Sequence, residues 1–385
     1  MTLALSFKAG SLFERGYPAG TAAFMAEMLA KGTKHRKAEE IAASLENVGG
    51  ELIIVSNKDI VGLRAIVLNE HLDLAVDLLC DILLNSTFPK EELEKQRRLQ
   101  VAEIETERDR PFRDAMLSYQ ELRYGSDHPW GRSHLGTEES IESIAREDLL
   151  RYYEAACTPD NACLSIVGDV DEEKIVRLFE EKLSSWQGSC KLAKVEQASK
   201  IDEARQQKFA KPERKQNFIL LGFEGAPFAS QDSVALEVYN NLVGGMGNRL
   251  FRNLRGKKSL AYQVGCYHSS SFQKKSEVFY IVTSKERGQE AIEALRAELQ
   301  ASLKEPLNEG ALQRAKNKVI GSTAIDLQKN RALAATLAYH ELVGAGWKHP
   351  FEKHAEVRAL TAEQVKKLAA QYLDFDKEIL AIVGP

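Results

Sequence analysis

The stretch "ACLSIVGDV", Ala162 to Val170, decides the fold, because the chain ends on nearly the same phrase, "EILAIVGP", Glu378 to Pro385. Both phrases read as short strand-like runs. Each follows a segment with apolar residues at helical spacing and a Thr placed to cap a helix, over residues 137–157 and 354–373. The chain therefore contains the same predicted helix–strand segment twice.

Two further pairs of segments extend this repeat. Residues 7–14 and 219–228 both read as a strand, a small-residue turn and a helix start, and residues 91–111 and 309–330 both read as long polar-faced helices. A repeat of roughly 180 to 200 residues is too long for a solenoid and predicts two homologous domains. We place these domains at 1–187 and 215–385, with the polar stretch 188–214 as a surface linker.

Hairpin patterns complete each half. Residues 49–68 alternate in two runs around Asn57-Lys58-Asp59, and residues 260–283 do the same in the second half. The sequence therefore predicts an α+β protein of two domains, each with a mixed or antiparallel sheet and long helices on one face.

Composition limits the classes of partner. Lys plus Arg number 52 against 56 for Asp plus Glu, and this net charge of -4 gives no field that attracts nucleic acid over long range. No apolar run reaches the length of a membrane span, so we expect a soluble chain, cytoplasmic or periplasmic if bacterial, and the compartment stays open. The five cysteines are scattered without a C-x-x-C pair, which disfavours a zinc ribbon or a disulfide framework.

The helix predicted over "GTAAFMAEMLAKGT", Gly20 to Thr33, resembles the first long helix of the pitrilysin and mitochondrial processing peptidase superfamily, the inverted zincins with H-x-x-E-H. The residues around the motif match those of the family helix, but the three residues of the motif that bind zinc and activate water are replaced. The two histidines of the motif fall on Ala23 and Glu27, and its glutamate base falls on Ala26. The resemblance extends over nearly the whole chain, including residues 128–144.

In the family, the third zinc ligand is a glutamate about 76 residues after the second histidine, and this spacing falls on Glu103. The resemblance therefore implies a degenerate zinc site at Ala23, Ala26, Glu27 and Glu103. Two carboxylates suit a hard cation such as Mg²⁺ or Ca²⁺, but these ions require six or more oxygens. We expect no metal or other cofactor in this chain.

The second half resembles the family in a glycine-rich turn, Gly244, Gly245 and Gly247, followed by Arg255 and, seven residues later, Tyr262. In the family, this Arg and Tyr bind the substrate carbonyl and stabilise the oxyanion. A guanidinium and a phenol are suitable donors for developing negative charge. The alternatives are a solvated Arg and a half-buried strand Tyr. The glycines form either a substrate-binding turn or a plain helix-start turn, and they do not match a phosphate-binding motif.

The resemblance implies a zinc-less subunit, inactive alone, that supplies Arg255 and Tyr262 in trans to a homologous H-x-x-E-H subunit, which holds zinc and cleaves unfolded peptides. The alternative is a non-enzymatic structural or peptide-binding subunit, like the core subunits of respiratory complexes. A stand-alone peptidase with another metal set is a third hypothesis. The family's usual opening strand with Asn-Gly-Leu has no counterpart here, so we expect an alternative start or another cover for that sheet edge.

Overall fold

The structure is a computed structural model that describes residues 1–195, 197–245, 247–268, 271–272 and 276–385. The chain forms two compact units, and each unit is assembled from separate segments. Unit 1 comprises Met1–Thr106, Ser133–Glu196 and Ile325–Pro350, and unit 2 comprises Glu107–Arg132, Gln197–Ala324 and Phe351–Pro385.

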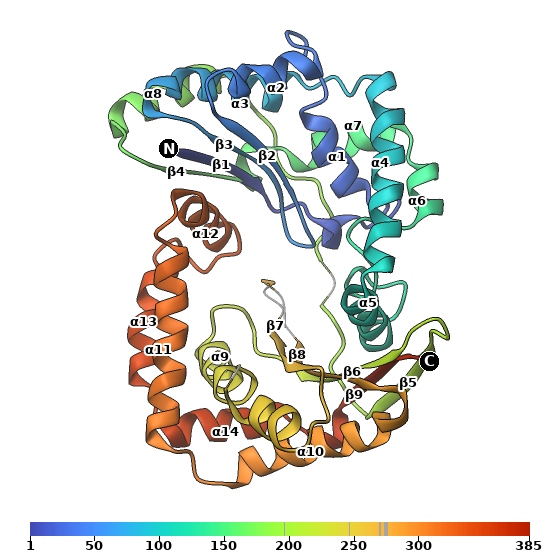
Figure 1. Ribbon diagram of the computed structural model, residues 1–385. Coiled ribbons are helices and arrows are strands. Elements are labelled where there is room, and N and C mark those ends of the chain that lie inside the picture. The colour runs from blue at the N-terminus through green and yellow to red at the C-terminus, as the bar shows by residue number, and fades with distance from the viewer. Residues whose placement is uncertain (196, 246, 269–270, 273–275) are drawn as a thin grey trace. The chain divides into compact units, whose positions relative to one another are not determined.

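Unit 1 is built on an antiparallel sheet with the strand order β2-β3-β1-β4 (Figure 1). Strands β2 and β3 form the predicted hairpin, and β1 pairs with both β3 and β4. The strands are β1 (Thr2–Phe7), β2 (Glu51–Ser56), β3 (Val61–Ile66) and β4 (Ala162–Val167).

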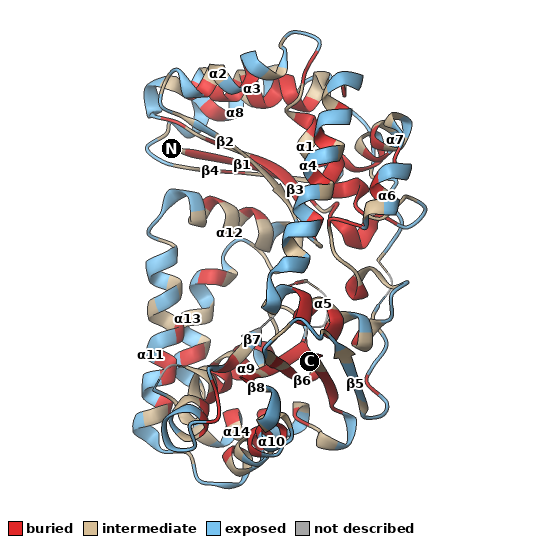
Figure 2. Ribbon diagram, turned by 45° about the vertical axis from the view of Figure 1, so that its right-hand side comes forward, coloured by how far each residue is buried: buried red, intermediate tan, exposed pale blue. Residues whose placement is uncertain are grey.

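One face of this sheet is covered by helices from the first half of the chain. Leu3, Leu5 and Phe7 of β1 point into the resulting core, which contains most of the apolar side of α3. Figure 2 shows the buried residues concentrated on β1 and on the helix sides that face the sheet. The helices of unit 1 that precede α12 are α1 (Thr21–Leu29), α2 (Ala38–Glu46), α3 (Leu72–Asn85), α4 (Lys90–Asp109, whose last residues enter unit 2), α6 (Glu138–Ser143), α7 (Arg146–Ala156) and α8 (Glu172–Lys182).

The opposite face of the unit 1 sheet is covered by α12 (Asn330–Leu342), which comes from the second half of the chain and packs on β1 and β4. Its Ala334 and Ala338 are fully buried, and small residues let a helix approach a sheet closely. The hydroxyl of Tyr339 donates to Asp59 Oδ2 in the β2–β3 hairpin at 2.7 Å. The strand β1 is consequently buried on both faces.

Unit 2 is built on a mixed sheet with the order β5-β9-β6-β8-β7, in which only the pair of β5 and β9 is parallel. Strands β7 and β8 form the second predicted hairpin, whose connection lies partly outside the described residues. The strands are β5 (Arg205–Ala210), β6 (Gln216–Glu224), β7 (Gln263–His268), β8 (Ser276–Ser284) and β9 (Ile379–Gly384).

The unit 2 sheet is also covered on both faces. Ile219, Leu221 and Phe223 of β6 point into the larger core, which is formed with the helices of the second half. These helices are α9 (Gln231–Gly244), α10 (Gly288–Lys304), α11 (Glu309–Asp326, whose last residues enter unit 1), α13 (His349–Ala359, whose first residues belong to unit 1) and α14 (Ala362–Tyr372).

The second face of this sheet binds α5 (Pro111–Tyr124), which comes from the first half of the chain. Its Tyr119 is fully buried and lies directly over Gly222 of β6, where a Cβ atom would overlap the tyrosine ring and hydroxyl. Gly222 therefore gives α5 its close approach to β6.

The predicted α+β class with two sheet-and-helix units is confirmed. The domain limits 1–187 and 215–385 follow the sequence repeat, whereas the compact units also exchange the segments that carry α5 and α12. The interpretation of all of 188–214 as a plain linker is wrong for Arg205–Ala210, which form β5 because β9 offers them a free edge. No helix in the described part of the chain combines the length and apolar character needed to cross a membrane.

We predict that Gly222→Ala lowers the free energy of unfolding by about 2 kcal/mol, because the added methyl group overpacks the contact with Tyr119. Urea unfolding followed by circular dichroism measures this change. Gly321→Ala is the matched control, because a Cβ atom at Gly321 meets no other atom within 4 Å and alanine favours the helix. Equal midpoints for Gly222→Ala and the unmodified chain would contradict the role given to this contact.

Candidate functional site

Hydrogen bonds with neighbouring side chains hold the N-terminus of helix α1 in place. Gly20 caps it with φ 89°, and the buried carboxylate of Glu14 accepts hydrogen bonds from the backbone N–H groups of Gly20 and Ala22 at 3.0 and 2.8 Å. A carboxylate at this position satisfies free N–H groups and interacts favourably with the helix dipole. Gln100 of α4 donates to the carbonyls of Gly20 and Leu135 at 3.3 and 2.9 Å. These contacts hold α4 against the start of α1.

Helices α1 and α4 carry the two acidic positions of the degenerate motif, Glu27 and Glu103. Glu103 lies one helical turn after Gln100, and its charge acts on Glu27 of α1. Burial raises the pKa of Glu27 above its ordinary value, the ammonium group of Lys31 lowers it, and the negative charge of Glu103 raises it further. The two carboxylates are therefore coupled electrostatically.

The side chains at this site do not fit zinc. Ala23 and Ala26 lie in the core with 3% and 0% exposure, and their methyl groups offer no ligand atom. A catalytic zinc site needs three protein ligands of the imidazole, thiolate or carboxylate type, and here only the carboxylates of Glu27 and Glu103 remain. Across the described residues, no group of three or more His, Cys, Asp or Glu side chains is placed to hold a metal ion. We derive no metal-dependent step in this chain.

The glycine-rich turn lies in unit 2, at the end of α9. Gly244 lets β7 approach, because a Cβ atom there would collide with the thiol of Cys266. Gly245 accepts a hydrogen bond from the N–H of Asn248 at 2.8 Å, and the amide of Asn248 donates to the carbonyl of Asn241. Gly247 has φ 98°, a conformation that favours glycine. A Cβ atom at Gly245 would lie 2.6 Å from the side-chain amide of Asn248, so each of the three glycines has a packing or backbone reason.

Arg255 lies on a π-helical segment, η5 (Phe251–Lys257). π-Helical turns are rare and occur frequently at functional sites. The N–H of Lys258 bonds the carbonyl of Asn253 at 3.1 Å, and the N–H of Leu260 bonds the carbonyl of Leu254 at 2.8 Å, so the chain turns sharply back after Arg255.

Polar contacts from neighbouring elements hold this segment firmly. Arg249 and Asn253 both bind Glu298 of α10, each at 2.8 Å. Thr283 of β8 donates to the carbonyl of Leu260 at 2.7 Å, and the backbone N–H of Tyr262 donates to Val282 at 2.8 Å. The backbone that carries both predicted donors is therefore fixed by α10 and β8.

The side chains of Arg255 and Tyr262 are nevertheless exposed. The guanidinium of Arg255 lies 5.1 Å from the ring centroid of Phe251, and no acidic side chain in the described part of the chain pairs with it. Tyr262 is 55% exposed. Both side chains therefore extend exposed hydrogen-bond donors from a backbone that neighbouring elements hold in place.

The turn between these two residues is strained. Ser259 has φ 48°, in the left-handed region that costs a residue with a Cβ atom roughly 1 kcal/mol or more. Arg287 donates to the carbonyl of Ser259 at 2.8 Å and helps to hold this conformation. Neither this strain nor the capping by Glu14 was predicted, because no local pattern in the sequence marks them.

Two family descriptions match separate parts of this chain. The family described as "Insulinase (Peptidase family M16)" matches residues 1–125, and the one described as "Peptidase M16 inactive domain" matches residues 143–319. A Rickettsia bellii protein described as an uncharacterized zinc protease is 32% identical over 81% of this chain and 75% of its own length. A Bacillus subtilis protein of like description is 29% identical over 98% of this chain and 91% of its own length.

The fold also matches solved structures. The crystal structure of a peptidase M16 inactive domain from Pseudomonas fluorescens has a TM-score of 0.90 and 23% identity, covering all of this chain and 92% of the other. Fold and sequence together define a two-unit α+β protein of the M16 type, whose described residues form no metal-binding group of three or more His, Cys, Asp or Glu side chains. The chain belongs to peptidase family M16.

The pKa of Glu27 gives a prediction for stability. Because folding raises this pKa above 4.5, the contribution of Glu27 to stability is complete below that pH and is lost as the pH rises through the folded value. Glu27→Gln should therefore be more stable than the unmodified chain at pH 7, by up to about 1 kcal/mol, and equal to it near pH 4. Thermal unfolding across this pH range tests the prediction, with Glu103→Gln, at an exposed position, as a weaker control. A loss of stability in Glu27→Gln at pH 7 would count against it.

Ser259→Gly gives a second prediction. Glycine adopts a positive φ without steric cost, so the free energy of unfolding should rise by up to about 1 kcal/mol. The control is Ser230→Gly, because Ser230 has an extended conformation and caps α9 with its side chain, and its replacement should not stabilise. Chemical unfolding of both variants provides the measurement, and stabilisation of both or of neither would contradict the assignment of strain to Ser259.

Proposed function

We propose that this chain is the zinc-less subunit of a two-subunit M16 peptidase and supplies Arg255 and Tyr262 to the reaction of a partner. The observation that carries the proposal is the contrast between the two sites. The motif helix α1 has methyl groups at Ala23 and Ala26, while unit 2 presents two exposed donors on a backbone fixed by α10 and β8. The descriptions of its relatives as zinc proteases support the class of reaction.

The chemistry assigned to this chain is electrostatic. When the carbonyl carbon of a peptide bond is attacked, negative charge develops on its oxygen, and a guanidinium and a phenol can donate hydrogen bonds to it. Arg255 would carry the opposite charge, and Tyr262 would add an O–H donor. In the partner, an H-x-x-E-H site would supply the metal that activates water. Gly244, Gly245 and Gly247 are proposed to let the backbone of an unfolded peptide pass close to α9.

The reconstituted pair tests this function. The chain is mixed with an H-x-x-E-H family member from the same genome, and hydrolysis of a quenched fluorescent peptide is followed. Arg255→Ala should lower kcat by roughly a hundredfold, as is usual when one oxyanion donor is removed, and Tyr262→Phe by a similar or smaller factor. Because these interactions strengthen in the transition state, KM should change little.

Two variants serve as matched controls. Arg252 is an exposed arginine on the same π-helical segment, and Tyr267 is an exposed tyrosine on the strand that follows Tyr262. Arg252→Ala and Tyr267→Phe should leave kcat unchanged. If Arg255→Ala and Tyr262→Phe also leave it unchanged while the two subunits still associate, the chain is a structural or peptide-binding subunit and the catalytic proposal is wrong.

A further inference from the structure

Two of the five cysteines, Cys157 and Cys190, lie close together in unit 1, although β4 and α8 separate them in the sequence. Cys157 follows the last residue of helix α7 and is 7% exposed, while Cys190 follows α8 at a half-buried position. Both are free thiols. Two neighbouring thiols can be oxidised to a disulfide within one chain.

Backbone hydrogen bonds place Cys190 beside the end of α7. Its N–H donates to both carboxylate oxygens of Asp160, at 2.9 and 3.1 Å. The N–H of the next residue, Lys191, donates to the carbonyl of Ala155 at 3.0 Å. Because Cys157 lies between Ala155 and Asp160, these bonds bring its backbone and that of Cys190 close together, as a disulfide requires, with its Cα atoms within about 7 Å of each other.

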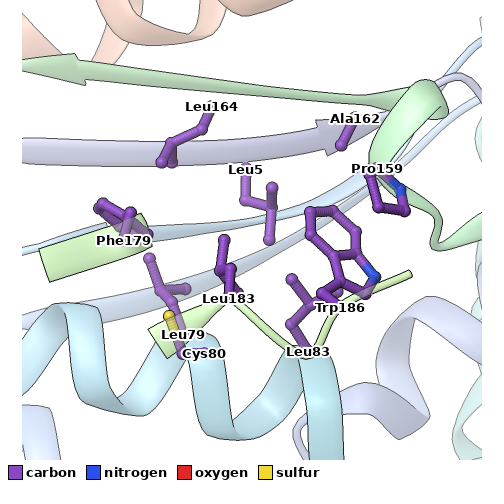
Figure 3. Close-up of a pocket in the computed structure, with 10 residues that line it drawn as sticks. All are labelled: Leu5, Leu79, Cys80, Leu83, Pro159, Ala162, Leu164, Phe179, Leu183 and Trp186. Carbon is purple, nitrogen blue, oxygen red and sulfur yellow. The ribbon is translucent and has the colours of Figure 1, made fainter. Parts of the chain in front are cut away.

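Trp186 attaches the same segment a few residues earlier. Its indole N–H donates to the carbonyl of Cys157 at 3.1 Å. Its ring makes an edge contact with Phe7 of β1 at a centroid distance of 6.3 Å, and it lines an apolar cavity together with Pro159 (Figure 3). The segment from Trp186 to Lys191 is therefore held against the end of α7 at both of its ends.

The two thiols also act on each other electrically. Burial raises the pKa of the Cys157 thiol, and a negative charge on Cys190 raises it further. In the described part of the chain, the charged neighbours that act on Cys80, Cys163 and Cys266 besides burial are Lys, Asp or Glu side chains, not a second thiol. Cys157 is thus protonated and shielded at physiological pH, and Cys190 is the thiol that a dissolved oxidant reaches first.

We propose that Cys157 and Cys190 form a redox modification site, at which hydrogen peroxide converts the two thiols into a disulfide. The sulfur of Cys190 attacks one peroxide oxygen, the O–O bond breaks, and the products are a Cys190 sulfenic acid and water. The sulfur of Cys157 then attacks the sulfur of Cys190. The S–S bond forms, the S–O bond breaks, and the hydroxide leaves with the proton of Cys157 as a second water. Each sulfur gives up one electron, and the peroxide takes up both.

The disulfide closes a covalent loop that contains β4 and α8. A cross-link of this kind limits the number of open conformations of the chain within the loop. Cys190 lies in the polar stretch 188–214, which leads out of the first half of the chain. Oxidation therefore fastens the start of this stretch to unit 1. The proposal does not depend on the peptidase role of Arg255 and Tyr262.

The test treats the full 385-residue chain with hydrogen peroxide and then blocks the remaining thiols with iodoacetamide. Digestion with trypsin and with a protease that cleaves before Asp separates Cys157, in residues 152–159, from Cys163, in residues 160–168. Mass spectrometry should find residues 152–159 joined to residues 183–191, with the loss of two hydrogen atoms. Dithiothreitol should restore both thiols.

Three variants separate the roles of the cysteines. Cys190→Ser should abolish the disulfide and leave Cys157 reduced. Cys157→Ala keeps an apolar side chain in the core and should leave Cys190 as a sulfenic acid, which dimedone traps. Cys163→Ser is the matched control, because Cys163 is also half-buried but has Glu341 as its charged neighbour, and it should form the disulfide like the unmodified chain. Circular dichroism confirms that each variant is folded.

Limited proteolysis of the folded chain measures the effect of the cross-link. Lys191 is exposed, and cleavage after it requires the segment to open locally. Oxidation should slow tryptic cleavage at this bond by about tenfold or more, since the disulfide restrains the opening. Peroxide treatment of Cys190→Ser should leave the cleavage rate unchanged.

Three outcomes overturn the proposal. The first is the absence of a disulfide between Cys157 and Cys190 after peroxide treatment, whether Cys190 is unreacted or carries a sulfenic or sulfinic acid. The second is a disulfide of Cys190 with Cys163 or with a second copy of the chain, which a non-reducing gel detects. The third is a disulfide between Cys157 and Cys190 that leaves the rate of cleavage after Lys191 unchanged.

Discussion

The burial of β1 and β6 on both faces is the constraint on which the other features of the structure depend. Leu3, Leu5 and Phe7 of β1 face one core, while Ala4 and Ser6 on the alternate side are also buried. Strands covered on both faces require two helical layers, and the helices adjacent in sequence supply only one of them. The second layer is α12 in unit 1 and α5 in unit 2, each taken from the other half of the chain.

The sequence could not predict that α5 and α12 each pack on the sheet built mainly from the other half of the chain. Local signals predicted the hairpins, α1 and the capped helices that begin after Thr137 and Thr361, because periodicity and capping act over a few residues. The destination of α5 and α12 depends on contacts between residues far apart in the chain, and no local pattern records it. Strand β5 was missed for a related reason, since the residues Arg205–Ala210 are mostly polar and are ordered by pairing with β9.

Part of the candidate site could likewise be predicted from the sequence, and part could not. The family spacing predicted that Glu27 and Glu103 lie near each other, and the effect of Glu103 on the pKa of Glu27 agrees with this. The sequence could not predict that Ala23 and Ala26 belong to the core, so that α1 contributes packing at the positions where the motif has ligands. It also could not predict the π-helical segment, since that geometry depends on contacts with α10 and β8. A strained Ser259 beside exposed donors is typical of a site at which stability is sacrificed for preorganisation.

The two sheets differ at their equivalent edges. In unit 2, β9 lies between β6 and β5, whereas in unit 1 the described residues give β4 a single strand neighbour, β1. Natural sheets usually protect an exposed edge with a lysine, a proline, a bulge or a covering segment. Strand β4 has the sequence Ala-Cys-Leu-Ser-Ile-Val, without a charge or a proline, and it pairs with β1 in unbroken register from Ala162 to Val167. In unit 2, β5 covers the corresponding strand with a polar sequence of its own.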